Sequence, residues 1–172
     1  MSRSRSDRTR RIAPPVAQLI TDSDAAAAKS RLVGIRLATL TLRLRGSWTE
    51  LFGSPDAAAI ALAIVAIGAE RMLRDNLTPT LTSLATPMPA EAFGECNISA
   101  IAKATGFNRG TARRKVDELV QLGIVARKGS NITLVPGFSQ QPAAIKMVRR
   151  QLEFLRIATN EMIREGVITV RD

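Results

Sequence analysis

The fold is decided by the stretch Asn97-Ile-Ser-Ala-Ile-Ala-Lys-Ala-Thr-Gly-Phe-Asn-Arg-Gly-Thr-Ala-Arg-Arg-Lys-Val-Asp-Glu-Leu-Val-Gln-Leu-Gly-Ile-Val125. An asparagine side chain can accept a hydrogen bond from the free N–H groups that begin a helix, so Asn97 predicts a helix over residues 98–105. Gly106 follows at the position where helices commonly end in a left-handed residue, which glycine adopts without steric strain. This part of the stretch therefore predicts a short helix closed by a glycine turn.

A second helix is predicted directly after that turn, over residues 109–122. Asn108 stands at its N-cap and Gly123 at its end. The apolar side chains at helical spacing, which should point inward, are Ala112, Val116, Leu119 and Val120. The opposite face presents Arg109, Gly110, Arg113, Arg114 and Asp117. The helix is therefore expected to bury one side and to expose arginines on the other.

Two short β-branched runs follow the second helix. They cover residues 124–126 and 132–135, and the loop 127–131 between them contains Arg127, Lys128 and a glycine. Such runs, joined by a short loop with glycine, predict an antiparallel hairpin with a basic tip. A helix, a tight turn, a second helix and a basic hairpin together make the layout of a winged helix-turn-helix.

Residues 98–125 resemble the winged helix-turn-helix of bacterial transcriptional regulators, most of all MarR-like ones. The resemblance is clearest over 108–125, with a polar cap, a threonine at the fourth place, a basic pair and a glycine before the wing. It implies sequence-specific binding of duplex DNA, with the recognition helix 109–122 in the major groove and the basic wing 127–131 on the minor groove or backbone. The DNA contacts that it implies are Asn108, Arg109, Thr111, Arg113, Arg114, Arg127, Lys128, Ser130 and Asn131.

Two residues depart from the family pattern. Gly110 replaces the commoner serine or threonine, which leaves room for a close approach but lowers helix stability. Lys115 stands where an apolar residue is usual, so its aliphatic stem has to lie along the apolar surface with its charge turned to water.

The resemblance also implies a homodimer, because such regulators typically dimerise through their N- and C-terminal helices. Pro142 opens a last helix over residues 142–165, with Ser139 or Gln141 near its cap. An amphipathic stripe recurs there at spacings of three and four, and its residues are Ile145, Val148, Leu152, Leu155, Thr159 and Met162. From this stripe we assign dimerisation to Val148, Leu152, Leu155 and Met162.

The N-terminal half is predicted to be helical as well. Asp22 or Ser23 caps a helix over 24–36. Residues 37–45 alternate like a strand but are compatible with a continued helix, which we favour. Gly46 and Ser47 predict an interruption, followed by one turn over 48–52. Ser54 and Pro55 then predict the start of a largely buried helix that extends to Asp75.

The expected fold class is therefore mainly α, a winged helix-turn-helix with flanking helices that form a dimerisation region. A disordered basic tail over 1–13 precedes an N-terminal helical dimerisation segment over 14–54. The winged helix-turn-helix domain covers 55–138, including a connector over 76–93, and the C-terminal amphipathic helix belongs to 139–172.

The charge of the chain supports a polyanionic partner. The 172 residues carry 25 Lys and Arg against 15 Asp and Glu, a formal net charge of +10. Residues 97–131 hold seven basic and two acidic side chains, which gives +5 in one short segment. The chain has no histidine and one cysteine, Cys96, so His-based catalytic triads and His or Cys metal clusters are excluded within a single chain. We therefore expect no enzyme, no cofactor and no metal.

Two alternatives to a simple regulator stay open. The basic face could bind RNA or an acidic protein partner as an interaction module in a larger assembly. A ligand-responsive repressor would hold a small-molecule effector between the dimer helices and the winged domain, although no residue identifies such an effector. The absence of a long apolar run predicts no membrane segment, and the expected location is cytoplasmic, associated with the nucleoid.

Overall fold

The architecture is mainly helical. The computed structural model describes residues 17–74, 81–84, 86, 89, 94 and 96–171. Along the chain the elements are β1 (Gln18–Thr21), α1 (Ser23–Ala28), α2 (Ser30–Phe52), α3 (Pro55–Arg74), α4 (Ile98–Thr105), α5 (Arg109–Gln121), β2 (Val125–Lys128), β3 (Asn131–Leu134), η3 (Phe138–Gln140), α6 (Pro142–Arg164) and β4 (Ile168–Arg171). The predicted basic tail 1–13 and most of the connector 76–93 lie outside the described residues.

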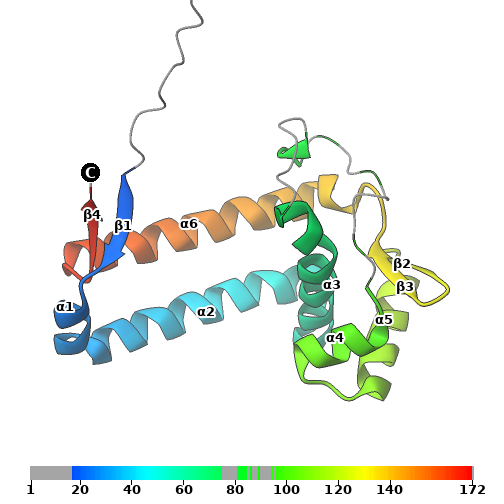
Figure 1. Cartoon of the computed structure of the whole chain (residues 1–172). Helices are drawn as coiled ribbons and strands as arrows, with labels where there is room; N and C mark the ends of the chain where they lie inside the picture. Colours follow the sequence, from blue (N-terminus) through cyan, green and yellow to red (C-terminus); the bar gives the residue numbers. More distant parts are fainter. Residues whose placement is uncertain are drawn as a thin grey trace, which may run out of the picture.

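The elements form an arm and a head (Figure 1). The arm consists of α2 and α6, which lie side by side, with α1, β1 and β4 at its far end. The head consists of α3, α4, α5 and the hairpin β2–β3 at the other end. Ion pairs join Arg36 to Glu161 and Arg150 to Glu50, so the two arm helices run antiparallel.

The hydrophobic core lies mainly in the head. Helix α3 begins as predicted, because the Ser54 hydroxyl accepts a hydrogen bond from the Ala57 N–H at 3.2 Å and Pro55 is its first residue. Four completely buried side chains come from α3, α4, α5 and β3, and they are Ile60, Ile101, Leu119 and Ile132. Burial of each contributes about 1.5–3 kcal/mol. This shared core fixes α5 and the hairpin relative to each other.

Helix α2 is longer than its sequence predicts. The favoured helical continuation over 37–45 is confirmed, but the predicted interruption at Gly46 and Ser47 is wrong. The Ser47 hydroxyl donates to the Leu44 carbonyl at 2.7 Å and accepts from the Gln151 side-chain amide of α6 at 2.9 Å. Because the buried serine is satisfied inside the arm, the helix continues to Phe52.

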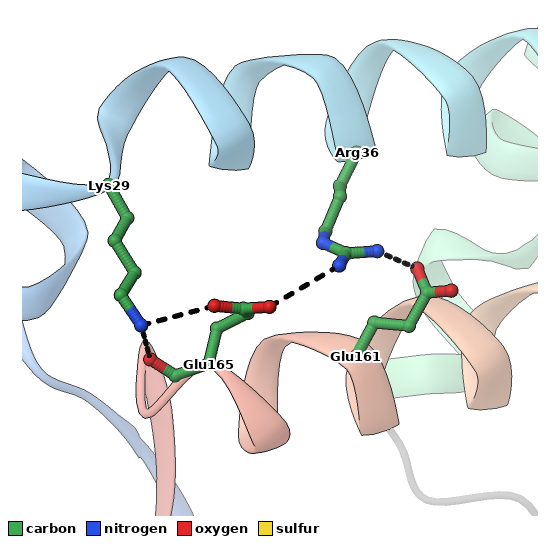
Figure 2. A network of polar contacts seen from close by, with 4 residues as sticks. All are labelled: Lys29, Arg36, Glu161 and Glu165. Atoms are coloured by element: carbon green, nitrogen blue, oxygen red, sulfur yellow. Dashed lines mark hydrogen bonds and ion pairs between the residues drawn. The ribbon is translucent and has the colours of Figure 1, made fainter.

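The break in this region lies instead at Lys29, between α1 and α2. Asp22, one of the two predicted caps, accepts a hydrogen bond from the Ala25 N–H at 2.9 Å. Lys29 departs from helical geometry with φ −108° and ψ 21°. Its ammonium group donates to the Glu165 carbonyl at 2.7 Å and lies 3.1 Å from the Glu165 carboxylate (Figure 2). The Lys29 side chain, at the break between α1 and α2, therefore joins the start of α2 to the end of α6.

A two-stranded sheet closes the far end of the arm. β1 pairs with β4 in antiparallel register, with Gln18 opposite Arg171 and Thr21 opposite Ile168. The sequence analysis does not predict it, because each strand has four residues and its partner lies about 150 residues away. The predicted C-terminal helix is confirmed to within one residue at its end, and its N-cap is Gln141 without a side-chain hydrogen bond.

No single helix in the described ranges is long and apolar enough to cross a membrane. The segments Ser30–Phe52 and Pro55–Glu70 meet the combined requirement of length and apolar composition only as a pair, and a bend of 94° separates them.

Candidate nucleic-acid interface

The turn between α4 and α5 has the predicted local geometry. The Asn97 side chain accepts from the Ala100 N–H at 3.0 Å, and the Asn108 side chain accepts from the Thr111 N–H at 2.8 Å. Gly106 has φ 74°, in the left-handed region that a residue with a Cβ rarely adopts. The two helices are thus capped independently and joined by a tight turn, which sets their relative direction.

Helix α5 is fixed by its inner face. Ala112, Val116 and Leu119 are completely buried against the head core. Val120 is 37% exposed, so its predicted inward position is wrong, because α3 and α4 cover a narrower face than the apolar spacing suggests. The helix ends at Gln121, and Gly123 follows with φ 68°. Helix α5 is therefore a rigid element with one side outside the core.

Two arginines on the outer side of α5 are free to bind a ligand. Arg109 and Arg113 are exposed. Within the part of the chain that the structure describes, neither has a hydrogen-bond or ion-pair partner. Arg114 is also exposed, but its guanidinium lies 3.2 Å from the Glu118 carboxylate one turn later. The outer side of α5 thus offers two unengaged guanidinium groups and one in a surface ion pair.

Lys115 occupies the edge of the inner face. Its side chain is only 12% exposed, and its ammonium group lies 2.7 Å from the Glu118 carboxylate. The hydrogen bond from Lys115 is the main reason that the pKa of Glu118 lies below its usual value. The stem therefore packs along the helix while its charge reaches a partner, as the sequence analysis expects of a lysine at an apolar position.

The hairpin has a shorter loop than predicted, and its first strand is longer by one residue. Lys128 of β2 pairs with Asn131 of β3, which leaves only Gly129 and Ser130 between the strands. Gly129 has φ 62°, as tight two-residue hairpin turns require at a central position. The predicted five-residue loop 127–131 is therefore wrong, because the register extends the ladder to the edge of the turn.

The predicted wing residues divide into exposed and engaged side chains. Lys128 and Ser130 are exposed at the turn. Arg127 lies 3.5 Å from the Asp117 carboxylate of α5, and its Nε donates to the Gly129 carbonyl at 3.3 Å. This contact links the hairpin to the outer face of α5, so the two basic elements form one surface.

Asn131 has a structural task. Its side-chain carbonyl accepts from the Cys96 N–H at 3.0 Å, and the Ile132 N–H donates to the Cys96 carbonyl at 2.8 Å. These bonds tie the hairpin to the segment that enters α4. The Cys96 side chain is completely buried, and burial raises the pKa of its thiol to about 11. The sequence shows neither contact, because the partners lie 35 residues apart.

The predicted dimerisation residues do not share one environment. Leu152 is 60% and Leu155 is 50% exposed, whereas Val148 is half-buried. Met162 is only 9% exposed, so little of its side chain is accessible from outside the chain's own arm. Only the middle of the predicted stripe is therefore available to another molecule.

A cavity of about 230 Å³ lies where the arm meets the head. Its wall is mostly apolar and includes Trp48 and Phe52 of α2, Phe138 of η3 and Val148 of α6. Trp48 stacks on Phe52 and Phe52 on Phe138, each with ring centroids 5.7 Å apart. The cavity therefore lies between the arm helices and the head.

Taken together, the outer side of α5 and the hairpin tip present a basic surface. Its exposed members are Arg109, Arg113, Arg114, Arg127 and Lys128, and its supporting residues are Asn108, Thr111 and Asn131. Guanidinium groups on the exposed face of a helix can form paired hydrogen bonds with phosphate oxygens or with guanine edges. Comparisons of the chain with protein-family models, with curated proteins and with solved structures give no match.

Proposed function

We propose that this chain binds duplex DNA sequence-specifically through a winged helix-turn-helix built from α3, α4, α5 and the hairpin β2–β3, and that it regulates transcription. The observation that carries the proposal is the pair of exposed, unpartnered arginines, Arg109 and Arg113, on a helix whose other side is completely buried. An α-helix fits the major groove of B-DNA, and arginine is the commonest reader of guanine there.

Arg113 is the candidate base reader. It lies one turn into α5, where the side chains of a recognition helix reach the base edges. Arg109 stands at the first position of the helix, the end at which free N–H groups also attract a phosphate. Arg109 therefore positions the helix, while Arg113 supplies sequence preference.

Gly110 supports the N-terminal end of this contact. A Cβ added there would lie 3.3 Å from the Asn108 side-chain oxygen, which is tighter than most real contacts. The glycine thus leaves the capping asparagine in place next to the surface that would face DNA.

The wing contributes phosphate contacts. Lys128 is exposed at the hairpin turn, and the Arg127–Asp117 pair holds the hairpin against α5. Because Arg127 forms an ion pair with Asp117, its positive charge is partly compensated. Lys128 is therefore the stronger candidate for a contact with the DNA phosphate backbone. This division predicts base preference from α5 and general affinity from the wing.

The test measures binding of fluorescent duplexes, first selected from a random library, over a range of salt concentrations. The logarithm of the binding constant should fall linearly with the logarithm of salt, by about 0.9 for each phosphate contact. The Arg113→Ala variant should lose about 1–3 kcal/mol on the selected duplex and lose preference at one base position. Arg31→Ala removes the same charge from the arm and should leave affinity nearly unchanged.

Two outcomes would contradict this function. Equal binding of single-stranded RNA and of duplex DNA would favour the RNA-binding module. Equal losses for Arg113→Ala and Arg31→Ala would show that only the total charge matters and that α5 has no special part.

A further inference from the structure

The arm carries positive charge that the DNA-binding proposal does not use. Residues 17–52 and 142–171 together hold eleven basic and six acidic side chains, which gives +5, the same surplus as in residues 97–131. The arm extends away from α5 and the hairpin (Figure 1). DNA bound at α5 and the hairpin therefore does not neutralise the charge of the arm.

The glutamates of the arm already have partners within the chain. Four of them form ion pairs with a lysine or an arginine of the same arm: Glu50, Glu153, Glu161 and Glu165. Within the described residues, seven exposed basic side chains of the arm have no carboxylate partner, and Arg43, Arg45 and Arg164 are among them. Carboxylates that would neutralise these side chains therefore have to come from another molecule.

A groove of about 280 Å³ runs along one flank of the arm, between α2 and α6. Its apolar wall consists of side chains from both helices: Leu32, Ile35, Leu40, Phe154 and Ile157. On α2 the lining residues extend from Leu32 to Arg43, which is about 17 Å or three helical turns. Ile35 is 59% exposed, so this wall is open to solvent. The groove therefore has the length and the apolar surface to accept a short helix.

Positive charge lies along both edges of this groove. Arg43 of α2 and Arg150 of α6 both lie over the ring of Phe154, at 5.8 Å and 5.5 Å from its centroid. Arg164 follows the groove-lining Ile157 by seven residues, a spacing that keeps two side chains on the same side of a helix. The apolar wall thus lies between two basic edges, one on each helix.

We propose that this groove binds an acidic amphipathic helix of another protein, which completes a three-helix bundle with α2 and α6. An amphipathic helix places apolar side chains into such a groove at positions i, i+3, i+4 and i+7. Its flanking carboxylates would then face the arginines at the two edges of the groove. The proposal rests on this charge complementarity together with the apolar wall.

A second copy of this chain does not offer such a helix. Helices α2 and α6 each carry a net charge of +3, so either of them would bring like charge to the basic edges. Like charges placed opposite each other across an interface oppose binding. The complementary partner is therefore a different protein with an acidic helix.

The groove is separate from the predicted dimerisation stripe. Leu152 precedes the groove-lining Phe154 by two residues, which places the two side chains about 200° apart around α6. A helix bound in the groove would therefore leave the dimerisation stripe uncovered. The groove also lies on the arm, so this proposal does not depend on DNA binding by the head.

The test measures fluorescence polarisation of labelled peptides with the full-length chain, without DNA. The probe is an amphipathic peptide of about 14 residues, or four helical turns, with leucines on one face and glutamates on the other. A cross-link between two of its polar-face side chains keeps it helical, because short helices are marginal in water. The acidic peptide should bind. A peptide with lysine in place of glutamate, and a scrambled acidic peptide of the same composition, should bind at least about tenfold more weakly.

Two pairs of variants locate the binding site on the arm. Arg43→Glu should weaken binding of the acidic peptide about tenfold, because it opposes like charges at the edge of the groove. Arg45→Glu changes the net charge equally on a different face of α2 and should weaken binding less than about twofold. Ile35→Ser should likewise weaken binding about tenfold, whereas Leu37→Ser, also two residues away, should have little effect. Circular dichroism checks that all four variants keep the helix content of the wild type.

Three results would overturn the proposal. Absence of binding by the acidic peptide, or equal binding of the acidic and the lysine peptides, would show that the groove does not select acidic helices. Equal losses for Arg43→Glu and Arg45→Glu would mean that only the total charge matters. A loss with Arg113→Ala in place of Arg43→Glu would mean that the peptide binds the basic surface of the head. Since DNA is absent, failure of the DNA-binding proposal leaves the result unaffected.

Discussion

Cys96 supports the basic surface of α5 and the hairpin although it is not part of that surface, and it does so through Asn131. The Asn131 side chain holds the Cys96 backbone, and the Cys96 thiol fills the core beneath the hairpin. Sequence reasoning places Asn131 at the wing tip as a DNA contact. Its register opposite Lys128 places it at the end of the strand instead, where its amide oxygen has a backbone partner.

The buried thiol makes stability dependent on alkaline pH. Burial raises the pKa of Cys96 from 9.0 to about 11 in the folded chain. Its contribution is fully present below the unfolded value and is lost as pH rises from 9.0 toward 11, because the unfolded thiol ionises first. Urea unfolding of the wild type should therefore show a larger loss between about pH 8 and about pH 10.5 than unfolding of Cys96→Ala. Equal losses would show that other groups cause the whole effect.

At the scale of elements, local signals predict the helix ends of the head. Ser54, Asn97 and Asn108 cap α3, α4 and α5 by bonds to residues three positions later, and Gly106 takes the predicted left-handed conformation. These contacts depend only on neighbours in the sequence. The exposure of Arg109 and Arg113 follows from the same 3.6-residue period.

Contacts between distant elements explain what the sequence does not reveal. The glycine at 46 favours a break, but Ser47 finds a partner on α6 and the helix continues. The β1–β4 pairing and the Arg127–Asp117 contact likewise depend on the relative placement of elements. Such contacts are invisible in a single segment, whereas the local preference against a glycine in a helix is about 1 kcal/mol.

Gly46 gives a direct measure of that local preference. It is exposed inside α2, and an added Cβ would meet nothing within 4 Å. Gly46→Ala should raise the free energy of unfolding by about 0.5–1 kcal/mol, because alanine loses less backbone entropy. Thermal or urea unfolding measures this gain.

Gly53 provides the control for that substitution. It ends α2 with φ 82°, so Gly53→Ala should lower stability by about 1–2 kcal/mol although space is also open there. A loss at Gly46 similar to that at Gly53 would mean that α2 bends at the glycine in solution.

At the scale of the whole molecule, the arm would connect two heads in the homodimer that the sequence analysis expects. A two-fold homodimer would present two copies of α5 to one duplex, one from each head.

The two-fold symmetry of such a homodimer predicts an inverted repeat in the selected DNA, with one half-site for each head. Leu155→Glu places a charge at a residue that the sequence analysis assigns to dimerisation, so the variant should still bind one half-site but should lose the gain in affinity from the second. Footprinting and binding to duplexes with altered spacing measure both effects. If the variant bound paired half-sites as tightly as the wild type does, the result would contradict the role of the arm in dimerisation.

The β1–β4 sheet determines how the molecule would respond to tension. β1 begins at Gln18 and β4 ends at Arg171, and these two residues are paired. The start of β1 and the end of β4 therefore lie at the same end of the sheet. A pulling force on the ends would open the strand pairs one after another, as in a zipper, instead of loading them all together. The arm would then separate from its far end inward, and the head would be the last part to feel the load.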